Sequence, residues 1–286
     1  MPKFDTPEPI SATLDLVIGD ARIIASDRSD TLVEVRPSDP GTDIDVKAAE
    51  QTRIEYAEGR LLVKAPKQRG LGLFGKPGSV DVEISLPAGS QLSGEASIAG
   101  FTVTGRLGEC RIKTSIGNLR LDRTGALDLN TATGDITVHA VAGHAAASTS
   151  AGQVLIDEID GDAVIMNSNG SCRLGTVTGS LKANNSNGDI QVEHARADVT
   201  AATARGNIRI GEVSRGTVSV KSSFGELEVG IPAGTTAYLD LHTQFGSMHN
   251  RLDGAAEPAP GEPSVDVRAR TGFGDIVIRR PLGEAR

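Results

Sequence analysis

The stretch with the clearest chemical motif is the loop APKQRGLGLFGKPG at residues 65–78. Its glycines Gly70, Gly72 and Gly75 satisfy the G-x-G-x-x-G pattern of dinucleotide sites, and the same run matches most of a phosphate-binding loop. Both motifs need a helix directly after the glycines, because the amides at its N-terminus hold the phosphates. The sequence that follows, SVDVEISLP, alternates as a strand does, and Pro77 replaces the magnesium-binding hydroxyl. We therefore expect no nucleotide and no cofactor.

A second interpretation of this loop is a contact surface for another molecule. Residues 60–76 carry five basic side chains and no acidic one, although the whole chain has a net charge of −8. Exposed apolar groups beside cations bind anionic membrane surfaces or proteins. The alternative is a solvated basic loop whose apolar side chains pack on the flank of the fold. The predicted partner or membrane contact residues are Lys67, Arg69, Leu71, Leu73, Phe74 and Lys76.

Aspartates that follow turn glycines are the candidate metal ligands. Asp135, Asp189 and Asp275 each stand directly after such a glycine, as do aspartates in calcium-binding β-helices. Successive copies of this turn, however, carry Asn, Asp, Gln, Ser, Asp, Asn, Glu, Ser and Asp there, so no two neighbouring copies both supply Asp. We expect these residues to shape turns through local backbone hydrogen bonds, and we assign no metal ligand.

Catalytic constellations are not found in the sequence. Many large β-helices cleave polysaccharides, but sugar clefts need aromatic platforms, and the chain has no Trp and two Tyr. Its carboxylates are dispersed along turns rather than paired for glycosidic cleavage. Its five histidines lack metal-ligand spacing, and no G-x-S-x-G motif occurs. Cys110 and Cys172 make no disulfide framework, and we expect two buried thiols. The chain is predicted not to be an enzyme.

The turn that carries these aspartates recurs along the chain with a regular period. Successive turn glycines are separated by 17, 18, 18, 18, 18, 19, 21 and 28 residues. Aliphatic residues stand two and four positions after almost every glycine, with a mostly polar residue between them, which is typical of a strand with one buried face. The principal turn glycines are Gly117, Gly134, Gly152, Gly170, Gly188, Gly206 and Gly225. The representative core residues are Ile136, Val138, Ile190, Val192, Ile208 and Ile210.

Each repeat carries a second pair of apolar residues, such as Leu181 and Ala183, and therefore two short strands. A single coil cannot bury its own apolar stripe, whereas stacked coils join their stripes into one core. The aliphatic spacing fits a left-handed hexapeptide helix poorly, and right-handed parallel crossovers are the strong default. The predicted fold is all-β: a single-stranded right-handed β-solenoid, or β-helix, with coils of about 18 residues and no helix.

Two further columns predict contacts between coils. Thr, Asn or Ser stands three residues before each turn glycine, and we expect these side chains to bond to their counterparts in the coils above and below. Phe224, Phe245 and Phe273 stand directly before their glycines, and we expect them to stack and to close the C-terminal end of the core.

The irregular parts of the sequence predict the organisation of the chain. VIGDARII at 17–24 is a further copy of the turn, and we prefer one continuous solenoid to two domains. We assign residues 1–9 to a flexible N-terminal tail, 10–90 to irregular coils that cap one end, 91–282 to regular repeats and 283–286 to a tail. The Pro-rich stretch AAEPAPGEPS at 255–264 is expected to be a loop excursion that lengthens one repeat.

Composition limits the cellular setting and the partners. A hydrophobic content of 38% with 23% charged residues is typical of a globular chain. Net negative charge argues against a nucleic-acid partner, because that affinity depends on cationic contacts to phosphates. The N-terminus does not read as a signal peptide, and no apolar run is long enough to span a bilayer. We expect a cytoplasmic protein, with peripheral membrane association left open.

Three features together resemble a known bacterial family: the repeated S/T-x-G-D-I-x-V turns, the segment VDVEISLPAGS at 80–90, and the opening pattern L-x-L-x-x-G-D-A-x-I. The chain resembles the putative-adhesin, or β-strand repeat, family of unknown function, which is related to the toast-rack domains of envelope-stress proteins. The resemblance covers roughly residues 10–280 and implies a β-solenoid. The family has no established activity, so it implies no catalytic residues, and its adhesin label implies surface display.

Two functional classes follow from these observations. The first is a non-enzymatic scaffold or binding module that presents a repetitive surface to a protein or membrane-associated partner, in adhesion or envelope stress. The alternative is a self-assembling structural protein, similar to bactofilins, whose coils associate end to end, because exposed terminal strands pair readily. A polysaccharide-acting β-helix enzyme ranks third.

Overall fold

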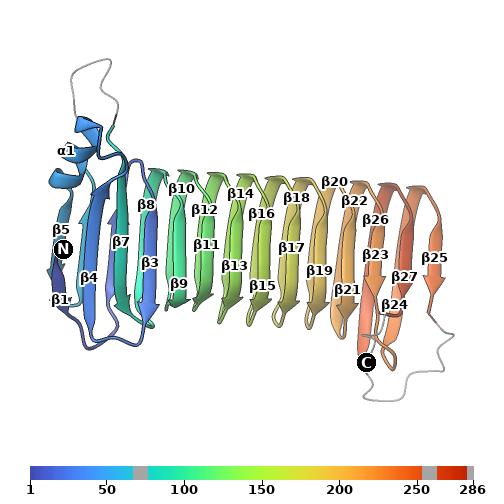
Figure 1. The fold of residues 1–286 in the computed structure, drawn as a ribbon. Coiled ribbons are helices and arrows are strands. Elements are labelled where there is room, and N and C mark those ends of the chain that lie inside the picture. Colours follow the sequence, from blue (N-terminus) through green and yellow to red (C-terminus); the bar gives the residue numbers. More distant parts are fainter. Residues whose placement is uncertain (67–76, 253–262, 282–286) are drawn as a thin grey trace. The chain divides into compact units, whose positions relative to one another are not determined.

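The computed structural model describes residues 1–66, 77–252 and 263–281. Strands dominate the chain, and from Val80 onward successive strands alternate between two sheets, so the predicted all-β solenoid is confirmed (Figure 1). By its internal contacts the chain divides into two compact units, unit 1 spanning Met1–Ala142 and unit 2 spanning Gly143–Arg286. The predicted boundaries at residues 9, 90 and 282 stay a prediction.

Unit 2 consists of stacked coils, each with one strand in either sheet. The first sheet contains, in spatial order, β15 (Val154–Ile159), β17 (Cys172–Val177), β19 (Ile190–Ala195), β21 (Ile208–Val213), β23 (Leu227–Gly230), β27 (Ile276–Arg279) and β25 (Met248–Arg251). The second contains β14 (Ala145–Ala151), β16 (Ala163–Asn169), β18 (Leu181–Asn187), β20 (Val199–Arg205), β22 (Gly216–Phe224), β26 (Ser264–Phe273) and β24 (Thr236–Phe245). Neighbouring strands in both sheets are parallel, as stacking of equivalent coils requires.

The core of unit 2 is built from equivalent positions of successive coils. Ile190 pairs with Ile208, and Val192 pairs with Ile210, so residues 18 apart lie directly above one another. All four side chains are at most 2% exposed. Ile136 and Val138 occupy the same kind of position in β13 (Ile136–Val141) of unit 1 and are fully buried. A regular column of aliphatic side chains therefore replaces a bulky aromatic core.

The turn glycines are required by close packing between coils. Gly188 has a φ of 135°, and a Cβ atom there would lie 2.2 Å from the carbonyl oxygen of Gly170 in the preceding coil. A backbone that approaches this closely leaves no room for a side chain. The same constraint recurs at Gly170, where a Cβ would lie 1.9 Å from the Gly152 oxygen.

The Thr, Asn and Ser side chains that stand three residues before the turn glycines form different hydrogen bonds from those predicted. The side chains of Asn185 and Thr203 donate to the carbonyl oxygens of Gly170 and Gly188, at 2.8 and 3.2 Å. They therefore secure the turn backbone of the preceding coil rather than their own counterparts. The turn carbonyl points into the corner where this column lies, and it would otherwise be an unpaired buried acceptor.

The last two coils of unit 2 do not stack in chain order. The coil of β26 and β27 lies between the coil of β22 and β23 and that of β24 and β25 (Figure 1). Phe273 accordingly stacks between Phe224 and Phe245, with ring centroids 4.9 and 4.7 Å apart. The stack itself was predicted, but its rings are 46–56% exposed and lie outside the core, so they do not close it. Most of the predicted loop at 255–264 lies outside the described residues.

Unit 1 continues the same two-sheet pattern with irregular additions. One sheet contains β1 (Lys3–Asp5), β4 (Asp30–Pro37), β7 (Val80–Pro87), β3 (Ala21–Ser26), β9 (Phe101–Arg106), β11 (Leu119–Thr124) and β13 (Ile136–Val141). The other contains β12 (Leu127–Thr133), β10 (Cys110–Ile116), β8 (Gln91–Ile98), β2 (Ser11–Asp15), β6 (Arg60–Lys64) and β5 (Arg53–Ala57). Three pairs are antiparallel: β1 with β4, β4 with β7, and β5 with β6.

Two elements of unit 1 correct the sequence predictions. Lys3–Asp5, assigned to a flexible tail, form β1, and Phe4 packs against Tyr56 with ring centroids 5.1 Å apart. A helix, α1 (Asp43–Gln51), forms where none was expected. Only Asp45 and Ala48 of this helix are buried, so its sequence lacks an apolar period. Asp45 instead accepts a hydrogen bond from the amide of Ser79 at 2.8 Å, which joins α1 to the start of β7.

Candidate functional site

The contact residues predicted in the basic loop, Lys67, Arg69, Leu71, Leu73, Phe74 and Lys76, lie outside the described residues. The described flank of that loop includes Lys64, which forms an ion pair of 2.9 Å with Asp15 on the neighbouring strand β2. The predicted loop surface therefore stays a prediction, and the candidate site is built from other residues.

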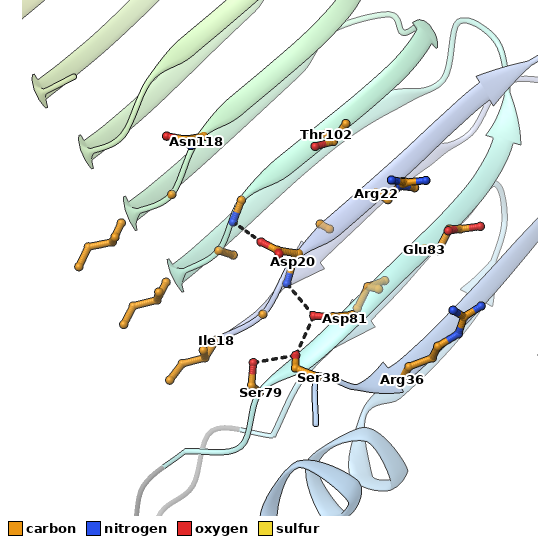
Figure 2. Close-up of a pocket in the computed structure, with 18 of the residues that line it drawn as sticks. Ile18, Asp20, Arg22, Arg36, Ser38, Ser79, Asp81, Glu83, Thr102 and Asn118 are labelled. Atoms are coloured by element: carbon orange, nitrogen blue, oxygen red, sulfur yellow. Dashed lines mark hydrogen bonds between the residues drawn. The ribbon is translucent and has the colours of Figure 1, made fainter. Parts of the chain in front are cut away.

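An open depression of about 820 Å³ lies on unit 1, over the strand ends of β3, β4, β7, β9 and β11 (Figure 2). Parallel strands bring outward residues into rows across the sheet. Arg22 lies opposite both Glu83 and Thr102, and Thr102 lies opposite Arg120. Residues more than eighty positions apart in sequence thus share one surface.

The floor of the depression is a chain of hydrogen bonds that Figure 2 shows. The hydroxyl of Ser38 lies 2.8 Å from that of Ser79 and donates to Asp81 Oδ1 at 2.7 Å. The same carboxylate oxygen accepts from the amide of Asp20 at 3.2 Å, and Asp20 Oδ1 accepts from the amide of Gly100 at 3.0 Å. These carboxylates hold neighbouring strands together, which limits their availability as acids, bases or ligands.

Turn aspartates bond in the same way elsewhere in the chain. Asp189 Oδ1 accepts a hydrogen bond from the amide of Asn207 at 2.7 Å, and Asp275 Oδ1 accepts one from Ser247 at 2.7 Å. The expected local turn bonds are thus replaced by bonds to the adjacent coil. In the described ranges, no three His, Cys, Asp or Glu side chains gather as metal ligands.

The cations of the depression fall into two groups. Arg36 forms a two-point ion pair with Glu34, which lowers the pKa of Glu34 and raises the pKa of Arg36 through hydrogen bonding and Coulomb attraction. Arg22 and Arg120 are exposed, and neither forms an ion pair with any residue that the structure describes. They lie two strands apart, roughly 10 Å at the usual strand spacing. The depression therefore presents two guanidinium groups without an ion pair among the described residues, although its lining also includes the carboxylates of Asp20, Glu34, Asp81 and Glu83.

An apolar rim borders these arginines. Ile18, Ile98 and Ile116 stand in register at the corner between the two sheets, about 5 Å apart from coil to coil. Ile98 and Ile116 are 44% and 49% exposed, which is unusual for isoleucine. Figure 2 shows Ile18 at this corner, beside the start of the hydrogen-bonded floor.

The sequence did not predict this surface because one coil lacks the turn glycine that the other coils share. Ala99, not a glycine, pairs with Gly117, so the coil that contains Ile98 did not align with the others. A related motif was nevertheless present, since VIGD at 17–20, SIAG at 97–100 and SIGN at 115–118 share an isoleucine before the turn. Arg22 and Arg120 carried no comparable sequence pattern.

A second open depression, of about 880 Å³, lies on unit 2 and is also lined by arginines, among them Arg173 and Arg209. Its cations are more engaged than those of unit 1. Arg209 lies 3.6 Å from Glu228, which Arg279 also contacts, and Arg173 donates to Gln191 at 3.3 Å. The described lining of this surface has no apolar rim like the isoleucine corner, so the depression on unit 1 is the stronger candidate.

Stacked two-strand coils with exposed rows of side chains define a β-solenoid of the binding or scaffold class. The sequence matches the Toastrack DUF4097 family over residues 24–279, and the chain belongs to that family. This confirms the resemblance to the toast-rack and putative-adhesin group. No curated protein matches the sequence.

Several solved structures resemble the chain over nearly its whole length. A putative cell adhesion protein from Clostridium sporogenes shares 13% identity, covers 98% of each chain and has a TM-score of 0.23. A putative adhesin from Bacteroides fragilis shares 10%, with 97% of this chain and 95% of that one covered and a TM-score of 0.31. A putative lipid binding protein from Parabacteroides distasonis shares 13%, with the same coverage and a TM-score of 0.37.

None of the helices in the described part of the chain combines the length and the apolar character that crossing a bilayer requires. The cytoplasmic location expected from the sequence stays a prediction.

Proposed function

We propose that the protein is a non-enzymatic binding module, and that the depression on unit 1 binds a protein segment carrying carboxylates beside aliphatic side chains. The observation that carries this proposal is the pairing of two arginines without ion-pair partners, Arg22 and Arg120, with the exposed isoleucine corner. Family membership favours a non-enzymatic role and a binding or scaffold class, without naming a partner.

The chemistry of the surface selects this ligand class. Guanidinium groups bind carboxylates through paired hydrogen bonds, and such charge-assisted bonds are the stronger kind. The isoleucine corner adds apolar contact, which a carboxylate-rich segment without aliphatic residues would not use. A sugar ligand fits poorly, because the lining residues include no aromatic side chain.

A peptide array tests the proposal. Peptides of about 12 residues that combine Glu and Leu would be compared with peptides in which Lys replaces Glu and with Glu-Ser peptides that lack aliphatic side chains. Arg22→Glu and Arg120→Glu should each lower affinity for the Glu-Leu peptides about tenfold or more, the loss expected for one charge-assisted hydrogen bond. Arg173→Glu in unit 2 makes the same charge change away from the depression and should leave binding intact.

Three outcomes would contradict the proposal. Equal binding of the Glu and Lys peptides would show that the arginines do not recognise the carboxylates of the ligand. Equal loss in the Arg173→Glu control would indicate a general charge effect. Binding to anionic lipid vesicles that depends on Arg22 and Arg120, without binding to the peptides, would favour a membrane-associated ligand instead.

We do not propose the self-assembling filament that the sequence left as an alternative. A filament grows only if each copy can pair with another copy through strand edges at both ends of its stack of coils. In unit 1 the edge strands β1 and β5 pair antiparallel with their neighbours, and β5 carries Arg53 and Glu55 on its exposed positions. Short strands and charged side chains are devices that block edge-to-edge pairing.

A further inference from the structure

The coil of β24 and β25 forms the outer end of unit 2. It takes this place because the coil of β26 and β27, although later in the sequence, lies between it and the rest of the unit (Figure 1). Each of its strands pairs with β26 or β27 on one side. On the other side, neither strand pairs with any strand in the described part of the chain.

The inward side chains of this coil form an incompletely covered apolar layer. In the adjacent coil, Val267 and Ile276 are fully buried. Their register partners in the outer coil are Leu239, which is only half-buried, and Met248, which is 55% exposed. These side chains occupy core positions of the repeat, so their exposure means that one layer of cover is missing among the described residues.

Aromatic side chains gather at the same end. The chain has six Phe and two Tyr in all. Three of the six Phe, namely Phe224, Phe273 and Phe245, are exposed in the last three coils of unit 2, and Phe245 is the outermost ring of their stack. In a chain so poor in aromatics, this concentration indicates a contact surface, because aromatic residues are enriched in interfaces.

The free edge of β24 is suited to strand pairing. The amide of Thr236 donates to the Pro263 oxygen at 3.0 Å, toward β26. Because backbone groups alternate between the two edges of a strand, those of Ala237, Leu239 and Leu241 point to the free edge. β24 spans ten residues, contains no proline and has one carboxylate, Asp240, whose side chain is on the outer face. It therefore lacks the usual protection against pairing.

We propose that this end is a dimer interface, and that two copies of the chain join through their β24–β25 coils about a two-fold axis. The outer coil leaves two unpaired strand edges, those of β24 and β25, and the apolar layer between these edges is also incompletely covered. A single peptide strand could cover only one edge, whereas the end of a second solenoid matches both. Met248 is 55% exposed, whereas β1 and β5 expose no large apolar side chain among the described residues, so we expect the β24–β25 coil to pair with its own copy.

The two-fold arrangement pairs β24 with β24 of the second copy in antiparallel orientation. Leu239 and Met248 of each copy then cover the apolar layer of the other, and the association stops at two copies. This inference does not depend on the ligand proposed for the depression on unit 1.

Sedimentation equilibrium of the full chain between about 1 and 100 µM tests the proposal. The wild-type protein should have twice the protomer mass. Leu239→Lys places a charge on each side of the interface and should raise the dimer dissociation constant at least about a hundredfold. Tyr238→Lys, on the adjacent residue of the same strand, points to the outer face and should leave the dimer intact.

A second variant guards against loss of folding. Met248→Asp alters a side chain that is already 55% exposed, so the coil can tolerate it, and it should dissociate the dimer as Leu239→Lys does. A monomeric wild type at 100 µM, a persistent dimer in both interface variants, or filaments in electron micrographs would each overturn the proposal. Arg22→Glu should remain dimeric, which separates this test from that of peptide binding.

Discussion

Neighbouring residues in β19 and its turn give the sharpest test of how the coils are held together. Ile190 is fully buried, in register with Cys172 in one adjacent coil and Ile208 in the other. Asp189 precedes it and accepts a hydrogen bond from the amide of Asn207. Truncation of Ile190 to Ala removes part of the shared core layer, whereas Asp189→Asn keeps a carbonyl oxygen in place of the accepting carboxylate.

The expected magnitudes differ clearly. Ile→Ala at a fully buried site costs about 2–5 kcal/mol, because the lost transfer free energy is joined by the cost of the remaining cavity. The stacked coils restrict collapse around Ile190, which favours the upper part of this range. Asp189→Asn loses only the charge assistance of one exposed hydrogen bond, about 1 kcal/mol or less. Ile190→Asp would be more severe than either, since it leaves an unpaired charge in the core.

Urea unfolding followed by far-ultraviolet circular dichroism measures these differences, since the chain has no Trp for fluorescence. Ile190→Ala should shift the midpoint strongly, Ile190→Val should cost about 0.5–1.5 kcal/mol, and Asp189→Asn should lie near the wild type. Equal midpoints for Ile190→Ala and Asp189→Asn would refute the register on which the core is built.

Three further predictions concern the turns, the thiols and the N-terminal strand. Gly170→Ala should cost more than about 2 kcal/mol, because φ is 136° and the new Cβ would lie 1.9 Å from a carbonyl oxygen. Gly59 also has a positive φ, 72°, but its Cβ would meet no atom within 4 Å, so Gly59→Ala should cost only the backbone strain of about 1 kcal/mol; equal thermal midpoints for the two variants would contradict this. Burial raises the pKa of Cys110 to about 12 and that of Cys172 to about 11, so both should resist alkylation at pH 8 until the protein unfolds. Because these folded pKa values lie above the ordinary 9.0, the thiols' contribution to stability is complete below pH 9 and falls as the pH rises toward 11 and 12; a Cys110→Ala, Cys172→Ala variant should show a smaller alkaline decline in melting temperature. Lys3 and Arg28 lower the pKa of Asp30 through hydrogen bonds, so their support of β1 should weaken as the pH falls below about 3.8, and Asp30→Asn should abolish that acid dependence in hydrogen exchange of residues 3–5.

The candidate surfaces illustrate where sequence reasoning reaches its limit. The exposed isoleucines depend on the pairing of Ile98 with both Ile18 and Ile116, and the first of these lies 80 positions away. The arginines of the depression could not be predicted for the same reason, because no short sequence pattern distinguishes Arg22 or Arg120 from other exposed cations. The stacking of the three Phe rings could be predicted from their equivalent positions before the turn glycines. Their exposure could not, because an equivalent position in each repeat does not reveal whether the ring points into the core or toward solvent.

The sequence by itself determined the repeat, the buried columns and the turn glycines. These features are local, because strand alternation has a period of two and the tight turns demand a backbone that only glycine adopts readily. Only the tertiary structure decided the helix α1, the antiparallel strands of unit 1 and the insertion of β26 and β27 inside β24 and β25. Each of these depends on which strands find one another, and parallel coils of nearly equal shape accept more than one neighbour. The order of stacking is therefore settled by the packing of whole coils rather than by any short pattern of residues.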